Sequence, residues 1–119
     1  FYDLVEKARE GATKGNIATI LSAVRIYAAN NVGVLPQDLT AESFENYMVK
    51  VPEVKVTCPH GKFQLKGYSN EIEVLENSEG TVFKEETDGW RYDRATGLVW
   101  VNNAQKDTTG MYYTYYGYH

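Results

Sequence analysis

The sequence has 119 residues, of which 43% are hydrophobic and 24% charged, a composition typical of one globular domain. Sixteen Asp and Glu against twelve Lys and Arg give a net charge of −4, which argues against a nucleic-acid-binding protein. No apolar run reaches the ~20 residues that span a bilayer, and a single cysteine, Cys58, excludes an internal disulfide. The chain begins with Phe1 rather than Met, so we interpret it as a processed chain or a fragment that a leader or membrane segment could precede.

Residues 2–30 are predicted to form one long helix, because no proline interrupts them and apolar residues recur at steps of three and four. The helix is expected to end at Asn30 to Gly33, just before Pro36. Gly11 and Gly15 each cost a helix roughly 1 kcal/mol relative to Ala, so tertiary packing has to stabilise its middle. The apolar positions are Leu4, Val5, Ala8, Ala12, Ile17, Ile20, Leu21, Val24, Tyr27 and Ala28.

A connector with a short helix is predicted over residues 32–60. Thr40 is its expected N-cap, and Phe44, Tyr47 and Met48 supply a small apolar face. Residues 54–58 then show a weak alternation of apolar and polar side chains, bounded by prolines.

Short alternating runs predict an antiparallel sheet over residues 61–119, ending in a Tyr-rich tail. Asp88-Gly89 is a turn signal, and residues 94–97 are the expected loop of a β-hairpin. The chain is therefore a single α+β domain, with residues 1–31 as a long helix packed on a small antiparallel sheet. The expected strands are 63–65, 72–75, 81–84, 90–93, 98–102 and 111–116. The expected core is Ile17, Leu21, Val24, Ala28, Trp90, Val99 and Val101.

Signals for catalysis or metal binding are weak. Cys58 and His60 lie two residues apart, but His119 is the one further imidazole, and zinc sites need three or four protein ligands. No phosphate-binding loop or nucleophile motif is present, so an enzyme is not expected and no cofactor is implied. Calcium is the more open question, although EF-hand spacing is lacking. Its weak candidate ligands are Asp88, Asp93, Asn102 and Asp107.

Aromatic residues are the remaining signal. The chain has ten tyrosines, concentrated near its C-terminus, together with Trp90 and Trp100. Tyr is favoured in strands, but a strand with tyrosines on both faces presents one of them to another molecule. We therefore expect an interaction surface here, with a carbohydrate-binding platform as an alternative.

Two segments resemble the type IV pilins and the related pseudopilins of type II secretion. The first is residues 8–17, followed by the helix to Tyr27 and by Gly33-Val34-Leu35-Pro36-Gln37-Asp38-Leu39, which is similar to a "G-x-x-P-x-x-L" connector. The second is Asp88-Gly89-Trp90-Arg91-Tyr92-Asp93 with Gly97-Leu98-Val99-Trp100-Val101-Asn102, which is similar to the family's hairpin. The resemblance covers about residues 1–103. It departs from many pilins in having no disulfide, and from major pseudopilins in having one carboxylate in residues 103–110.

The resemblance implies a structural, non-enzymatic subunit of a helical filament at the cell surface. Its partners would be its own copies and an assembly machinery in the inner membrane. A hydrophobic segment preceding Phe1 would anchor the precursor in that membrane and, after leader removal by a prepilin peptidase, would pack in the core of the filament. No nucleic acid is required. A periplasmic pseudopilus is the alternative within the family, and a carbohydrate-binding adhesin is the alternative from another class. We expect the N-terminal half of the helix and the tail to contact other subunits through Leu4, Val5, Ala8, Tyr113 and Tyr115.

Overall fold

A computed structural model describes residues 2–40, 44–48, 50–54, 71–75, 89–102, 106–107 and 109–116. The long helix is confirmed as α1, Tyr2–Asn30. It ends as its sequence predicts, because the Gly33 backbone N–H returns to the Ala28 carbonyl (2.8 Å) with Gly33 at φ 81°. The preceding Val32 also adopts a left-handed φ of 57°, an uncommon conformation for a β-branched residue.

Three strands form a mixed sheet of order β1-β2-β3: β1 Ile72–Leu75, β2 Trp90–Asp93 and β3 Val99–Val101. The prediction of a purely antiparallel sheet is wrong, since β1 pairs with β2 in parallel and places Ile72 opposite Trp90. Parallel neighbours need a connection of about a dozen residues or more, and residues 76–89 are long enough to supply it. Tight-turn signals within that segment suggested a local hairpin instead.

The hairpin between β2 and β3 is antiparallel and has the expected loop. The Asp93 carboxylate holds this loop by accepting from the Ala95 N–H (2.9 Å) and the Thr96 hydroxyl (2.7 Å). Gly97 follows at φ 76°, and a Cβ there would meet a methyl of Leu35 at 2.8 Å. This position therefore requires glycine for its conformation and for its close approach to the connector.

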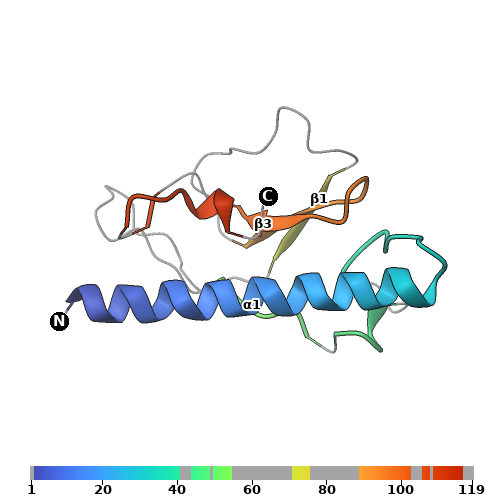
Figure 1. Cartoon of the computed structure of the whole chain (residues 1–119), viewed down its shortest axis with the longest axis horizontal. Helices are drawn as coiled ribbons and strands as arrows, with labels where there is room; N and C mark the ends of the chain where they lie inside the picture. The colour runs from blue at the N-terminus through green and yellow to red at the C-terminus, as the bar shows by residue number, and fades with distance from the viewer. Residues whose placement is uncertain are drawn as a thin grey trace.

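The core lies between α1 and one face of the sheet (Figure 1). Alternation along β2 and β3 turns Trp90, Tyr92, Val99 and Val101 toward the core and leaves Arg91 paired with Trp100 in register. The α1 side chains of this core are Ile17, Ile20, Ala23 and Val24, with Leu21 packed against its edge. Six of the seven expected core residues belong to this core or pack against it, and the seventh, Ala28, is half-buried.

The two large aromatic residues of β2 also bind the connector. The Trp90 indole N–H donates to the Pro52 carbonyl (2.8 Å), and the Tyr92 hydroxyl donates to the Pro36 carbonyl (2.6 Å). Between these two points, residues 44–48 form one turn, in which Phe44 and Tyr47 pack against Tyr27 of α1. The connector is thus held from both the sheet and the helix.

The expected strand at residues 111–116 is wrong. Tyr113–Tyr115 forms a short 3-10 helix, η2, and in the described part of this segment the extended pairing is one bridge between Lys106 and Tyr112. Because a 3-10 helix has three residues per turn, residues three apart share a side. The rings accordingly form two T-shaped pairs, Tyr113 with Tyr116 (5.6 Å between centroids) and Tyr112 with Tyr115 (5.7 Å).

Several sequence-based expectations lie outside the described residues. They are the strands at 63–65 and 81–84, the end of the alternation at 54–58, and the turn dipeptide's Asp88.

Two isoleucines of α1 test how the core is assigned. Ile20 is fully buried, whereas Ile26 is 54% exposed. We expect Ile20→Ala to lower the free energy of unfolding by about 2–5 kcal/mol, because it removes packed methyl groups and leaves a cavity. Ile26→Ala should change it by less than about 0.5 kcal/mol. Urea denaturation followed by circular dichroism measures both, and equal losses would contradict this packing of α1 on the sheet.

Candidate interaction surface

The outward face of α1 carries small side chains along most of its length. These residues recur at steps of four or three, which places them on one face of a helix, opposite the core. The face begins at Leu4, which is 69% exposed, and extends to Ile26. We call it the outer face and define it by Leu4, Ala8, Gly11, Gly15, Ala18, Ser22 and Ile26, all of them exposed.

Gly11 and Gly15 lie at the middle of the outer face. A Cβ atom added at either would meet nothing within 4 Å among the described residues. Neither glycine is therefore explained by a close contact within this part of the chain, although each weakens the helix by about 1 kcal/mol. A helix surface without side chains at positions i and i+4 does permit a second backbone to approach closely.

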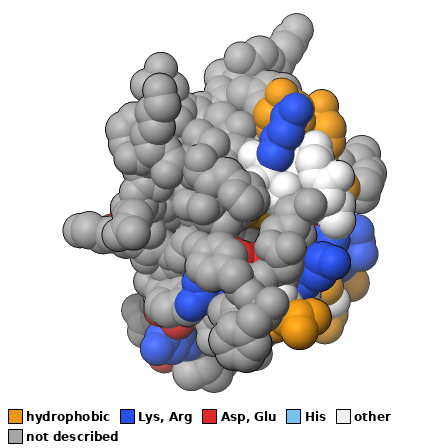
Figure 2. All heavy atoms as spheres, turned by 90° about the vertical axis from the view of Figure 1, so that its left-hand side faces the viewer, with side chains coloured by type: hydrophobic (Ala, Val, Ile, Leu, Met, Phe, Trp, Pro, Cys, Tyr) orange, Lys and Arg blue, Asp and Glu red, His pale blue; other side chains and the backbone are white. Residues whose placement is uncertain are grey.

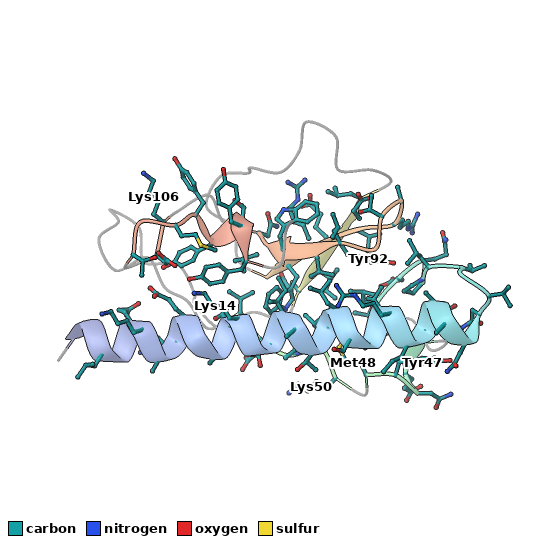
Figure 3. The ribbon with its side chains drawn as sticks, in the orientation of Figure 1. Lys14, Tyr47, Met48, Lys50, Tyr92 and Lys106 are labelled. Atoms are coloured by element: carbon teal, nitrogen blue, oxygen red, sulfur yellow. The ribbon has the colours of Figure 1, made fainter. Side chains whose placement is uncertain are left out.

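A shallow groove of about 410 Å³ continues the outer face toward the C-terminal end of α1. Ala18, Ser22 and Ile26 line it from the helix, and Tyr47 flanks it from the connector. Figure 3 shows Tyr47 and Lys50 on the side of α1 away from Tyr92 and the strands. The groove is open to solvent, and its walls are mainly apolar.

Basic side chains follow one edge of the outer face. Lys7 and Arg25 are both exposed and about five helical turns apart, so they lie along the same edge. The described acidic side chains of α1 are on the inner side, because Glu6 and Glu10 are buried. The outer face of α1 is therefore apolar and basic.

From the sequence, the N-terminal half of α1 was expected to contact neighbouring subunits and the C-terminal half to contact the sheet. In the structure, the inner face of both halves packs against the chain itself, and the outer face of both halves is exposed. On the inner side of the N-terminal half, Glu6, Glu10 and Thr13 are buried. Lys14 rises toward the C-terminal segment (Figure 3), with its ammonium 4.9 Å from the centre of the Tyr116 ring. The chain itself therefore covers the inner face of α1 at both ends.

The residues predicted to contact other subunits are found in different surroundings. Leu4 and Ala8 are exposed on the outer face, and the side chain of Val5 lies outside the described part. Tyr115 is 41% exposed, whereas Tyr113 is fully buried. Because the Tyr113 ring belongs to the core of its own chain, it has no surface to offer a second copy.

Asp107 anchors the C-terminal segment. Its buried carboxylate accepts hydrogen bonds from the Thr109 N–H (2.8 Å) and hydroxyl (2.6 Å), the Met111 N–H (2.9 Å) and the Tyr116 hydroxyl (2.7 Å). Burial by itself would raise the pKa of Asp107, but these hydrogen bonds outweigh it and lower the pKa. Burial and the bond to Asp107 raise the pKa of Tyr116, so its hydroxyl remains a donor.

No metal site forms in the described part of the chain, where no three His, Cys, Asp or Glu side chains gather. Of the weak calcium candidates, Asp93 and Asp107 use their carboxylates to hold separate loops, and Asn102 is buried at the end of β3. Asp88 lies outside the described residues, as do Cys58, His60 and His119.

The tryptophans do not form an exposed platform. Trp90 and Trp100 are both fully buried, and the guanidinium of Arg91 lies 5.9 Å from the Trp100 ring. A sugar stacks on an accessible aromatic face, so in this structure Trp90 and Trp100 have none to offer. The exposed aromatic ring of the described tail is Tyr115.

Sequence reasoning did not single out the exposed face of α1 that contains Gly11 and Gly15. The signal was present, because Leu4, Ala8, Gly11, Gly15, Ala18 and Ser22 repeat at steps of four and three. The more apolar inner stripe concealed it, since hydrophobic periodicity gives most weight to large side chains.

The described helix is too polar to be a membrane-spanning segment. No protein-family model matches the chain, and neither a curated protein nor a solved structure matches it.

The anchoring role of Asp107 gives a pH-dependent prediction. Because folding lowers the Asp107 pKa, the unfolded chain binds the proton more readily, and acid favours unfolding. The contribution of Asp107 is complete above its ordinary pKa of about 4 and is lost as the pH falls toward the lower folded value. We expect Asp107→Asn to cost about 1–3 kcal/mol at pH 7 and to flatten the decline in stability between about pH 5 and 2.

Asp38→Asn is the matched control, because Asp38 also accepts from a threonine N–H and hydroxyl two residues later, at an exposed turn. It should cost less than about 1 kcal/mol. Urea denaturation over this pH range provides the measurement. An unchanged acid dependence in Asp107→Asn would contradict the assignment.

Proposed function

We propose that this chain has a pilin-like fold and is a structural subunit of a type IV pilus-like helical filament. The observation that carries the proposal is that one face of α1 is buried against the chain's own domain while the opposite face is exposed. Its inner face binds the chain's own sheet and tail, while no described residue covers its outer face at Gly11 and Gly15, and this face begins at the exposed Leu4. A helix of this kind can support its own domain and pack against other helices at the same time.

The cost of the glycines supports association over an isolated monomer. Helix axes usually pack about 8–10 Å apart, and small residues at the contact allow the closer approach. Two exposed glycines in a helix lower its stability by about 2 kcal/mol in total. Contact with neighbouring subunits would offset that loss. Without side chains at Gly11 and Gly15, the backbone of a neighbouring helix can come closer and make more van der Waals contacts.

The two segments that resemble pilins also contact each other, which further supports the proposal. The Tyr92 hydroxyl bonds the Pro36 carbonyl (2.6 Å), and the Arg94 guanidinium donates to the Gln37 carbonyl (2.7 Å). Gly97 packs closely on Leu35. The connector and hairpin motifs thus form one structural unit, in which the glycine and the tyrosine of the hairpin motif have specific partners in the connector.

The proposal includes a hydrophobic segment N-terminal to Phe1, supplied by the same gene or by another. It would hold the precursor in the inner membrane for the assembly machinery and then enter the core of the filament. The partners are copies of the chain, and the filament would lie at the cell surface.

Electron cryo-microscopy of filaments sheared from the source cells tests this function. Filaments whose density fits α1 and the β2–β3 hairpin would support it. An upstream hydrophobic segment without surface filaments would favour the periplasmic pseudopilus. The absence of any such segment, from this gene and from neighbouring ones, would contradict membership of either filament class.

A double substitution separates assembly from folding. Gly11→Leu with Gly15→Leu should leave the isolated chain folded and raise its free energy of unfolding by about 1.5 kcal/mol, because Leu is the better helix former and meets no described residue at either position. Filament yield should fall at least about tenfold, because two leucines keep neighbouring helices apart. Ala95→Leu, in the exposed hairpin loop, is the control for added bulk. Normal filament yield from the double variant would contradict the role given to the outer face.

A further inference from the structure

β1 is an edge strand of the sheet, and it uses one side of its backbone to pair with β2. The carbonyls of Glu71 and Leu75 accept hydrogen bonds from backbone N–H groups at the start of β2 and just after it (2.8 and 3.0 Å). In a parallel ladder alternate residues bond to the same neighbour, so Ile72 and Val74 turn their N–H and C=O groups away from β2. No backbone group of the described residues bonds these outward groups. We call this side of β1 the open edge and define it by Ile72 and Val74.

The two faces of β1 differ in chemistry. Ile72 and Val74 are half-buried and pack against the core, so their side chains face α1. Glu71 and Glu73 alternate with them and belong to the opposite face, where the Glu73 carboxylate pairs with the Arg91 guanidinium (3.0 Å). A strand added at the open edge would lie about 4.8 Å from β1 and twice as far from β2. The two glutamates would therefore be closer to it than the charged side chains of β2.

We propose that the open edge of β1 binds an extended segment of another protein by strand addition, and that this segment alternates apolar with basic residues. Its apolar side chains would extend the surface of Ile72 and Val74, and its basic side chains would lie opposite Glu71 and Glu73. In antiparallel pairing, the two open-edge residues each exchange two backbone hydrogen bonds with the segment. This site involves neither the outer face of α1 nor the tail, so the inference is independent of the proposed filament.

Like charges disfavour a second copy of the chain as the occupant. The open edges of two copies can bond all their outward groups to one another in one antiparallel register, with Ile72 opposite Val74 of the copy. That register places the two Glu73 side chains directly opposite each other, where like charges are destabilising. Described Lys and Arg side chains are visible on the N-terminal side of the molecule (Figure 2), whereas β1 lies nearer the C-terminal end of α1 (Figure 1). A basic segment thus fits the open edge better than β1 of a second copy does.

Hydrogen exchange of single amides, followed by NMR, tests the proposal on the whole chain. The probe is the peptide acetyl-Leu-Val-Lys-Val-Lys-amide, which in antiparallel pairing places its valines opposite Val74 and Ile72 and its lysines opposite Glu73 and Glu71. We expect a saturating amount of probe to slow exchange of the Ile72 and Val74 amides at least about tenfold, because they become hydrogen-bonded. The Glu73 and Leu75 amides already point toward β2, so their exchange should slow by less than about threefold.

Val74→Pro separates backbone pairing from side-chain contact. It removes one outward N–H and none of the bonds to β2, so the chain should stay folded. Val74→Ala is the matched control, because it also reduces the apolar side chain but keeps the N–H. The dissociation constant of the probe, from NMR titration, should rise at least about tenfold in Val74→Pro and less than about threefold in Val74→Ala. Circular dichroism checks both folds, and if Val74→Pro unfolds, exchange in the wild-type chain still decides.

Unchanged exchange of Ile72 and Val74 at millimolar probe would overturn strand addition. Slow exchange without probe would also overturn it: if the protection grows with protein concentration, a second copy occupies the edge, and if it does not, another part of the chain covers it. A second probe, with glutamate in place of both lysines, should bind about tenfold more weakly. Equal affinity for the two probes would overturn the basic pattern assigned to the segment. None of these results bears on the proposed filament, which sheared filaments test separately.

Discussion

The packing of α1 against the inner face of β2 and β3 is the interaction on which the rest of the structure depends. A sheet of three short strands is stable when a hydrophobic surface covers it, and the inner stripe of α1 provides that surface. Trp90 and Tyr92 combine two tasks, because their rings fill the core while their polar atoms bind Pro52 and Pro36 of the connector. One contact surface thereby fixes the helix, the sheet and the connector together.

The parts of the fold that could be predicted from sequence are those with local signals. The helix over residues 2–30 and the hairpin around residues 94–97 have their periodicity, turn residues and glycines within a few positions of one another. The parallel pairing of β1 with β2 depends on where residues 76–89 lead the chain, and no local pattern encodes that. The tail was mispredicted because tyrosine's preference for strands was overridden by the local bonds that Asp107 makes with the same segment.

The candidate surface was harder to predict than the fold. Leu4 and Ala8 were identified because they are apolar residues in the helical repeat, but Gly11 and Gly15 were interpreted as a cost to be met by packing. That interpretation is incomplete, because the structure shows open space at both glycines within the described residues. A sequence gives the spacing of residues around a helix but not which face the domain covers. The outer face of α1 becomes recognisable once the inner face is known.

The anchoring of the tail by Asp107 has a consequence for where the chain can fold. Secreted domains of this size often close a terminal loop with a disulfide, which requires an oxidising compartment and, after an error, a slow thiol exchange. Here one carboxylate closes the loop with four hydrogen bonds to residues at most nine positions away. Such a closure depends on no oxidant, forms at the speed of local chain motion and reopens without chemistry. The packing of the tail is therefore independent of the redox state of the compartment in which the chain folds.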